Sequence, residues 1–312
     1  MPQRTSGARL VLVALAIVGC RNGADPNATA PKPQLFQSPA SSQTWDAVEL
    51  PVPLHGHRMH EVADGILLFG GFRAGRMQAA DESRETWFFD PKLGRWREVG
   101  QLNHGKSFFG SAVVNGIVYA IGTTIERYDP QTERWTSVYH NNALPTSHFG
   151  TAVLEGKIVI VASRIHRFDP KQGTCQELPP WPGKGRGDHF HCIASVGNTL
   201  HVVGGLDGET FDPKADHWTF AENCWSRLPD APRPVFAKFG VIEVIDHRLF
   251  ILTDQVGLSY DTMRNGWSVH PKMPRPVSMP ASVASRGRIL VLGGLPTDGT
   301  IRRRQTFDIL KG

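Results

Sequence analysis

Short apolar runs, each followed by a small or turn-forming pair of residues, recur along most of the chain. Runs such as "GILLFGG", "GIVYAIG" and "RILVLGG" are nearly all apolar, which is typical of strands covered on both faces. A shorter apolar stretch that ends in a turn precedes each run, as in "GSAVVNG", so the two together predict a β-hairpin. The apolar positions show no 3.6-residue period, which argues against an array of helices.

The pairs that end these runs reveal an internal repeat. There are six of them: Gly70-Gly71, Gly122-Thr123, Ala162-Ser163, Gly204-Gly205, Thr253-Asp254 and Gly293-Gly294. Glycine permits a positive φ and a close approach of the backbone, so the glycine pairs are structural candidates. Their first members are 52, 40, 42, 49 and 40 residues apart, a period typical of repeat architectures.

An aromatic residue followed by aspartate forms a second motif of the repeat. The aspartates are Asp90, Asp129, Asp169, Asp212, Asp261 and Asp308, and the residues six positions later are Trp96, Trp135, Cys175, Trp218 and Trp267. The aspartate side chain can accept hydrogen bonds from a turn, so we expect a third strand to end there. Each tryptophan would begin a fourth strand and pack between neighbouring sheets. No such residue follows Asp308 before the chain stops at Gly312.

Four-stranded units with this period, a double glycine and an aromatic-Asp-Pro-turn-Trp motif resemble the kelch-repeat family. The resemblance implies an all-β fold, a β-propeller whose blades surround a central channel. The stretch "TWDAVELPVP", Thr44 to Pro53, matches the fourth-strand pattern "CWSRLPDAP" and could supply the strand that the last unit lacks. We therefore predict a six-bladed kelch-type β-propeller closed by an N-terminal strand near Trp45, which would remove an open sheet edge.

The N-terminal segment predicts export and lipid anchoring. Residues 1–19 combine Arg4 and Arg9 with an apolar run too short to span a membrane, and "IVGC" resembles the lipobox of bacterial lipoproteins. In that interpretation Cys20 is acylated, residues 20–43 are a flexible tether, and residues 44–312 form the propeller. The protein would then be a lipid-anchored component of a bacterial cell envelope, in the outer membrane or facing the periplasm. An ordinary signal peptide, with Cys20 incidental, is the alternative.

Charge and cysteine content narrow the function classes. Without residues 1–19 the chain has 32 basic and 29 acidic side chains, a near balance that argues against nucleic acid as a partner. The spacing of Cys175, Cys192 and Cys224 fits neither a zinc site nor a disulfide framework, although one internal pair could form. The sequence contains no cofactor motif and indicates no metal site.

The starts of the innermost predicted strands are the candidate binding positions. Aligning the repeats places the following residues at equivalent positions around the channel: His57, Phe108, His148, His189, Lys238 and Met279. We take the polar ones, His57, His148, His189 and Lys238, as ligand-binding candidates, together with Arg73 in a long loop. An anionic or sugar ligand suits such a site, and the alternative is that the histidines bind backbone carbonyls and water lining the channel.

Two function classes remain open. No catalytic triad or carboxylate pair stands out, so the leading hypothesis is a binding scaffold for a protein or carbohydrate ligand at one propeller face. The alternative, implied by the resemblance, is a carbohydrate-active enzyme of the kelch mutarotase/epimerase or galactose-oxidase-like type. A pocket that gathers His57, His148, His189 and an acidic side chain would favour the enzyme.

Overall fold

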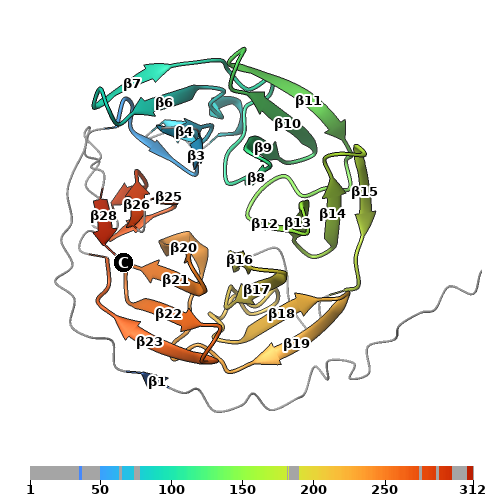
Figure 1. Cartoon of the computed structure of the whole chain (residues 1–312), viewed down its shortest axis with the longest axis vertical. Coiled ribbons are helices and arrows are strands. Elements are labelled where there is room, and N and C mark those ends of the chain that lie inside the picture. The colour runs from blue at the N-terminus through green and yellow to red at the C-terminus, as the bar shows by residue number, and fades with distance from the viewer. Residues whose placement is uncertain are drawn as a thin grey trace, which may run out of the picture.

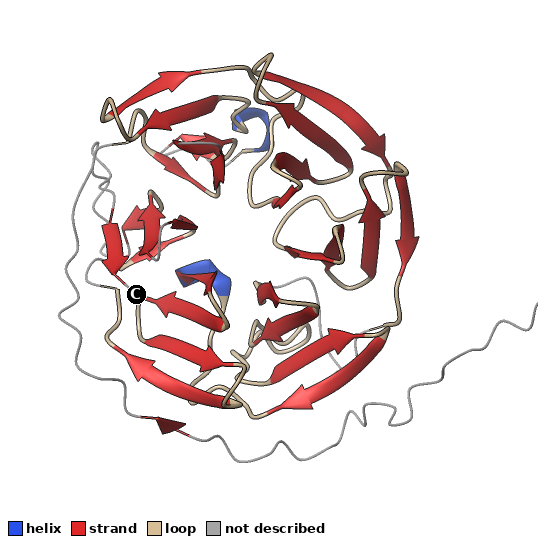
Figure 2. Ribbon diagram, viewed as in Figure 1, coloured by secondary structure: helices blue, strands red, loops and turns tan. Residues whose placement is uncertain are grey.

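Antiparallel sheets surround a central axis like the blades of a propeller (Figure 1). The computed structural model describes residues 35–36, 50–62, 65–73, 78–180, 182, 190–273, 276–285, 288–296 and 308–311. Strands and turns make up almost all of this structure, and the helical content is two single-turn 3₁₀ segments, η1 (Ala79–Asp81) and η2 (Ala237–Phe239) (Figure 2). The all-β propeller predicted from the repeats is confirmed.

Each complete blade is a meander of four antiparallel strands that runs outward from the axis. The first contains β3 (Arg58–Val62), β4 (Gly65–Phe69), β6 (Thr86–Asp90) and β7 (Arg95–Glu98). The second contains β8 (Gly110–Val114), β9 (Ile117–Ile121), β10 (Thr124–Asp129) and β11 (Arg134–His140). The third contains β12 (Gly150–Leu154), β13 (Lys157–Val161), β14 (Ile165–Asp169) and β15 (Thr174–Glu177).

Two further complete blades and a smaller sheet follow. The fourth blade contains β16 (Cys192–Val196), β17 (Thr199–Val203), β18 (His217–Ala221) and β19 (Cys224–Leu228). The fifth contains β20 (Gly240–Ile245), β21 (Arg248–Thr253), β22 (Gly257–Asp261) and β23 (Gly266–His270). The last sheet contains β25 (Ala281–Ser285), β26 (Arg288–Leu292) and β28 (Asp308–Lys311). Two short pairs stand apart, β2 (Leu54–His55) with β5 (Phe72–Arg73) and β24 (Val277–Ser278) with β27 (Leu295–Pro296).

The prediction of six four-stranded blades is wrong in number. The described residues form five complete blades, and the remaining sheet has three strands. Trp45 lies outside the described residues, so its closing strand stays a prediction. The N-terminal strand β1 (Leu35–Phe36) instead pairs in parallel with β23, at the outer edge of the fifth blade.

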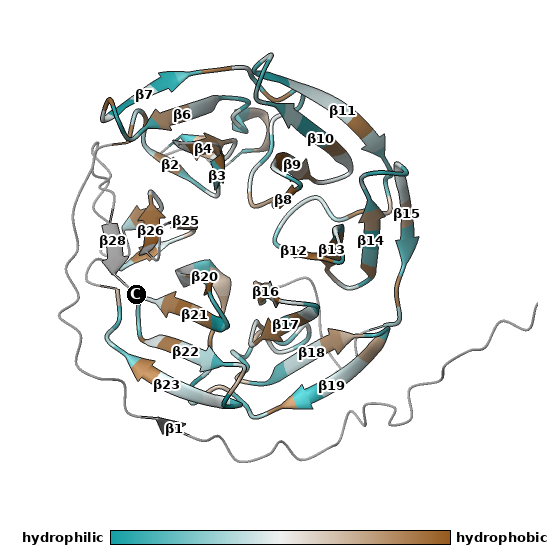
Figure 3. Ribbon diagram, in the orientation of Figure 1, coloured by the Kyte–Doolittle hydropathy of each residue, from teal (hydrophilic) through white to brown (hydrophobic). Residues whose placement is uncertain are grey.

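The hydrophobic core lies between neighbouring sheets. In the part of the chain that the structure describes, six clusters of buried apolar side chains each join two adjacent sheets. Inner strands supply most of these side chains, and β9, β13, β17 and β26 accordingly carry much of the brown colour in Figure 3. One cluster joins Met59 and Leu68 of the first blade to Val283 and Leu292 of the last sheet, so the ring of sheets closes by side-chain packing.

The glycine pairs act where neighbouring blades meet. The second glycine of each pair has a positive φ, and its N–H donates to a carbonyl that leads into the next blade: Gly71 to Lys106, Gly205 to Val235, and Gly294 to Leu54. A Cβ on Gly205 would lie 2.0 Å from Nδ1 of His191, so the position accepts no larger residue. Gly70, Gly204 and Gly293, the first members, also have positive φ values.

The aspartate motif ends the third strand of four blades as predicted. Oδ1 of Asp90, Asp129, Asp169 and Asp261 accepts a backbone N–H two residues later at 2.8–3.0 Å, which fixes the turn before the fourth strand. The fourth strand then brings a tryptophan directly opposite the aromatic residue, in the pairs Phe89–Trp96, Tyr128–Trp135 and Tyr260–Trp267. Cys175 takes the tryptophan position in the third blade, opposite Phe168.

Two copies of this motif are in a different place from the one predicted. Trp218 lies in the third strand β18 rather than at the start of the fourth, and Asp212 lies in the preceding loop. The turn between β18 and β19 uses Glu222 and Asn223, both at positive φ, so Trp225 becomes the residue opposite Phe220. Asp308 begins β28 instead of ending a strand.

Candidate functional site: the channel mouth

A closed circuit of backbone hydrogen bonds surrounds the channel where the innermost strands begin. Successive N–H groups donate to carbonyls one blade earlier, with N–O distances of 2.6–3.4 Å: Phe108 to Gly56, His148 to Phe108, Phe190 to His148, Ala237 to Phe190, Met279 to Lys238, and Gly56 to Met279. The peptide bond between Ala237 and Lys238 completes the circuit. We call Gly56, Phe108, His148, Phe190, Lys238 and Met279 the mouth ring.

Backbone strain accompanies this circuit. Phe108, His148, Phe190 and Met279 have φ values of 50–61°, a left-handed conformation that L-residues with a Cβ rarely adopt. Gly56 has a similar φ of 65°. Such strain persists where surrounding structure holds it in place, and it gathers at functional sites. The mouth ring is therefore a rigid frame that aims side chains at the channel.

The mouth ring corrects the alignment of strand starts by one residue in two blades. Phe108, His148, Lys238 and Met279 occupy the predicted positions. In the first blade the ring residue is Gly56 and not His57, and in the fourth it is Phe190, one position after His189. Nothing in the sequence indicated this one-residue shift, because Gly56 and Phe190 each lie between two histidines. What distinguishes the ring residue is its positive φ, which the sequence does not show.

Two cavities meet at the mouth ring. The chamber, a cavity of about 270 Å³, lies among the inner strands, and the vestibule, of about 740 Å³, lies among the loops of the first and second blades. Phe108, His148, Phe190, Lys238 and Met279 line both cavities. The side chains of the ring thus form the boundary that any ligand passing from the vestibule to the chamber would contact.

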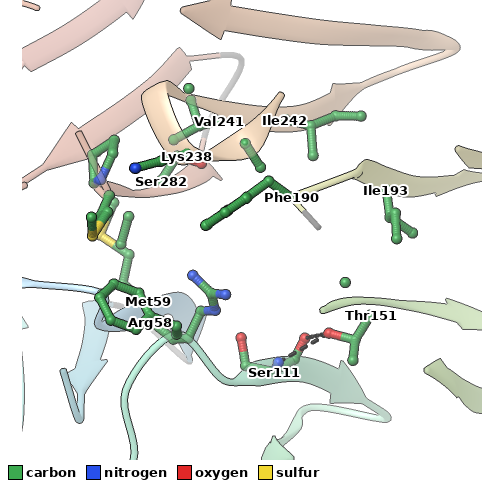
Figure 4. Close-up of a pocket in the computed structure, with 18 of the residues that line it drawn as sticks. Arg58, Met59, Ser111, Thr151, Phe190, Ile193, Lys238, Val241, Ile242 and Ser282 are labelled. Atoms are coloured by element: carbon green, nitrogen blue, oxygen red, sulfur yellow. Dashed lines mark hydrogen bonds between the residues drawn. The ribbon is translucent and has the colours of Figure 1, made fainter. Parts of the chain in front are cut away.

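Polar side chains from several blades line the chamber. Arg58 projects its guanidinium into the cavity from β3, with Ser111 and Thr151 nearby and Phe190 on the opposite side (Figure 4). Nε of Arg58 donates to the carbonyl oxygen of Phe109 at 2.6 Å, and Nε2 of His60 lies 2.9 Å from Oγ of Ser111. No carboxylate among the described residues forms an ion pair with Arg58.

Burial shifts the titration of the chamber groups. It raises the pKa of Glu243 to about 7, although hydrogen bonds from Oγ of Ser282 and from the backbone N–H of Ala284 partly oppose the shift. It also lowers the pKa of Arg58 to about 10 and, with the charge of Arg58, the pKa of His60 to about 4. Near neutral pH the chamber is lined by the Arg58 and Lys238 cations, a neutral His60, and Glu243, which titrates in this pH range.

The vestibule has its own buried ion pair. Nζ of Lys106 lies 3.3 Å from Oε1 of Glu126, which is fully buried, and donates to the carbonyl oxygen of Thr124 at 3.0 Å. The Glu126 carboxylate also accepts the backbone N–H groups of Asn103 and His104. With this many partners the pair ties the segment between β7 and β8 to strand β10 of the second blade, and the carboxylate is saturated.

The remaining predicted site residues lie elsewhere or outside the description. His57 is fully buried behind the ring, lines neither cavity, and has a pKa lowered to about 3, first by burial and then by the charges of Arg58 and His55. Arg73 is exposed in β5, pairs with Glu85 and also lines neither cavity. Their role in binding a ligand therefore stays a prediction that these two cavities do not support. His189 and the lipidation candidate Cys20 lie outside the described residues.

Sequence reasoning missed Arg58, Glu243 and Ser282. A signal for Arg58 was present, since inner strands begin two residues after the ring position with Arg58, Gly110, Gly150, Cys192, Gly240 and Ala281. Five of these residues are small, so the arginine is not demanded by the repeat. Among the described residues no three His, Cys, Asp or Glu side chains gather as a metal site, and Cys175 and Cys192 are free thiols.

The comparisons with known proteins agree with this architecture. No protein-family profile matches the chain. Human kelch-like protein 15 is 24% identical over 285 residues, covering 74% of this chain and 46% of its own length. Kelch-like protein 36 of Bos taurus is 22% identical over 275 residues, covering 77% of this chain and 43% of its own length. The chain is a β-propeller with kelch-repeat homologues.

A solved structure supports the fold. The structure of YjhT superposes with a TM-score of 0.68 at 13% identity, covering 84% of this chain and 95% of that one. At that identity the likeness concerns the fold alone. The chain spans less than half the length of the kelch-like relatives named above. No helix in the described residues is long and apolar enough to cross a membrane.

Proposed function

We propose that the protein is a non-catalytic binding protein that holds a protein partner at the mouth ring. The observation that carries the proposal is the set of ring side chains on a closed backbone frame. Phe108, Phe190 and Met279 offer apolar surface beside the cationic Lys238, and aromatic residues and methionine are enriched where proteins meet. Kelch-repeat relatives make the same role reasonable for this propeller.

The frame suits binding better than chemistry. His148 stacks on Phe108 with 4.8 Å between ring centroids, and its Nδ1 lies 2.9 Å from Oγ of Ser147. Its imidazole is thus held within an aromatic stack. The site offers no specific observation in favour of the carbohydrate-active enzyme.

Site-directed photo-crosslinking tests the mouth as the partner surface. A photoreactive residue at Met279 should crosslink a partner in the cells that produce the protein, because this side chain faces both cavities. The matched control is the same residue at Met263, which is 79% exposed in the turn between β22 and β23. Equal crosslinking from both positions, or crosslinking from Met263 alone, would contradict the proposal.

We also propose that the protein is exported and anchored through a lipid on Cys20, as the "IVGC" motif suggests. Mass spectrometry of the mature protein from its native host should find an acylated N-terminal cysteine. A Cys20→Ala variant should leave the membrane fraction. A mature chain that begins elsewhere, or an unmodified Cys20, would refute the anchor without touching the role of the mouth ring.

A further inference from the structure

The chamber beneath the mouth ring contains an unmatched cation. The Arg58 guanidinium donates from Nε to the Phe109 carbonyl and makes a long Nη1 contact of 3.4 Å with the His57 carbonyl. Its forked Nη groups face the cavity (Figure 4), and no described carboxylate neutralises them. The Arg58 side chain is partly buried, a partly desolvated guanidinium is stabilised by an anion beside it, and its planar donors match a carboxylate.

The surroundings of Arg58 complete a small polar site. The hydroxyl group of Ser111, whose partner is Nε2 of His60, lines the same cavity and can donate to an anion that Arg58 holds, whereas Thr151 already donates to the Ser111 carbonyl and Ser282 to Glu243. A volume of about 270 Å³ lies just below the usual range for ligand pockets, so the site fits a small group and not a large molecule.

The protonation state of Glu243 depends on whether an anion is bound in the chamber. Glu243 lines the chamber with Arg58, and the other charged or titratable groups there are His60, His148, His191 and Lys238. Two strands packed on β20 surround Glu243 with uncharged groups. Strand β25 offers the Ser282 hydroxyl, and strand β21 places Phe250 opposite Glu243. The charged Arg248 of β21 pairs with Asp261 instead. A second negative charge in this enclosed space disfavours the ionised form of Glu243.

We propose that the chamber binds a small carboxylate group, which Arg58 holds by its guanidinium while Glu243 takes up one proton. The complex then contains the Arg58 cation with its bound anion, the Lys238 ammonium group and a neutral Glu243, and the proton comes from solvent. The carboxylate could belong to a free small acid or to an acidic side chain that a partner inserts through the mouth ring. This site goes beyond the proposed function, because a protein can bind at the ring without reaching the chamber.

Isothermal titration calorimetry with sodium propionate, and with the blocked tripeptide acetyl-Gly-Glu-Gly-amide, tests the site. Titrations at pH 7.5 in two buffers of different ionisation enthalpy give the number of protons taken up with the ligand. Because a pKa of about 7 leaves about three quarters of Glu243 ionised at pH 7.5, we expect uptake of up to about 0.8 proton per carboxylate bound, and no binding of the neutral analogue propionamide. Binding of both probes indicates a free acid as sufficient ligand, and binding of the tripeptide alone indicates a partner's side chain.

Three variants separate the roles. Arg58→Gln should weaken binding at least about tenfold, because the charged hydrogen bonds are lost. Glu243→Gln should retain the affinity and show no proton uptake. Arg97→Gln, on the exposed surface where Arg97 pairs with Glu133, should behave as wild type.

Several results would overturn the proposal. These are failure of both probes to bind, unchanged affinity in Arg58→Gln, and proton uptake that persists in Glu243→Gln. If Arg58→Gln does not fold, Arg58→Lys replaces it and should also weaken binding, since it loses the forked donors. The proton uptake measured in Glu243→Gln does not depend on either Arg58 variant. The Met279 crosslink does not depend on the chamber, so the proposed function can fail or stand separately.

Discussion

Trp135 offers the sharpest test of how neighbouring blades hold together. Its side chain is 5% exposed and lies between the second and first blades, with ring centroids 5.0 Å from Phe69 and 5.2 Å from Tyr128. Its indole N–H donates to Oγ1 of Thr86, which is fully buried, at 2.9 Å. Trp135→Ala removes both the packing and the hydrogen bond, so it should lower the free energy of unfolding by about 3–5 kcal/mol.

A pair of finer substitutions separates the two contributions. Trp135→Phe keeps an aromatic ring but leaves the Thr86 hydroxyl without its donor, and Thr86→Val leaves the indole N–H unsatisfied. Each should cost about 1–3 kcal/mol, because a buried polar group then lacks its partner. The double variant should be less destabilised than the sum of the two, with a coupling of about 1 kcal/mol.

Urea unfolding followed by tryptophan fluorescence and circular dichroism measures these free energies. Leu93→Ala is the control, since Leu93 is 60% exposed and should change stability by less than about 0.5 kcal/mol. A cost below about 1 kcal/mol for Trp135→Ala would refute the interblade role. Strict additivity of Trp135→Phe and Thr86→Val would show that their hydrogen bond contributes nothing.

Three further predictions concern titration and turns. Burial raises the pKa of Glu243 to about 7 in the folded state from 4.5, so ionisation of this carboxyl opposes folding above about pH 4.5. In urea unfolding, the free energy of unfolding of Glu243→Gln should therefore exceed that of wild type by roughly 3 kcal/mol at pH 8 and by little at pH 4. The pKa of His57 is about 3 in the folded state and 6.5 in the unfolded state. The wild type should therefore lose stability as the pH falls below 6.5, by up to about 1.4 kcal/mol per pH unit, and His57→Asn should lose less over the same range. Asn223 has a φ of 60°, so Asn223→Gly should be tolerated in a thermal melt while Asn223→Val lowers the melting temperature.

The repeat in the sequence predicted the architecture well because it is made of local signals. The double glycines mark backbone approaches that no larger residue can make, as Gly205 shows, and the aspartates close turns through contacts two residues away. Both kinds of contact depend on a few neighbouring residues. The order of strands within each blade therefore follows directly from the pattern.

Prediction failed where two local signals competed. In the fourth blade the aromatic-Asp motif at Asp212 matches the repeat, but the turn at Glu222 and Asn223 also matches a hairpin and lies nearer to Trp225. The hydrogen bond from the Trp225 indole to the Pro179 carbonyl, at 3.3 Å, resembles that from Trp267 to Pro229 at 3.0 Å. Packing against the preceding blade selected the register, and a single sequence contains no direct measure of that packing.

The candidate site was harder to predict than the fold for a geometric reason. Its positions around the axis were placed within one residue, but a one-residue shift exchanges a position that lines the channel for a buried one, as with Gly56 and His57. Glu243 and Ser282 lie 39 residues apart and meet only because β20 and β25 are neighbours in the ring. Their pairing depends on the curvature of the whole propeller.

The backbone circuit at the mouth has a consequence for how this protein can change. Main-chain atoms of six segments fix the width of the opening, so substitution of Phe108, Phe190 or Met279 alters its chemistry without altering the support beneath it. New binding preferences could then arise by single substitutions at these positions, each at little cost to the blades. The same property would make the mouth a convenient place to engineer recognition of a chosen peptide, with the propeller serving as an unchanging host.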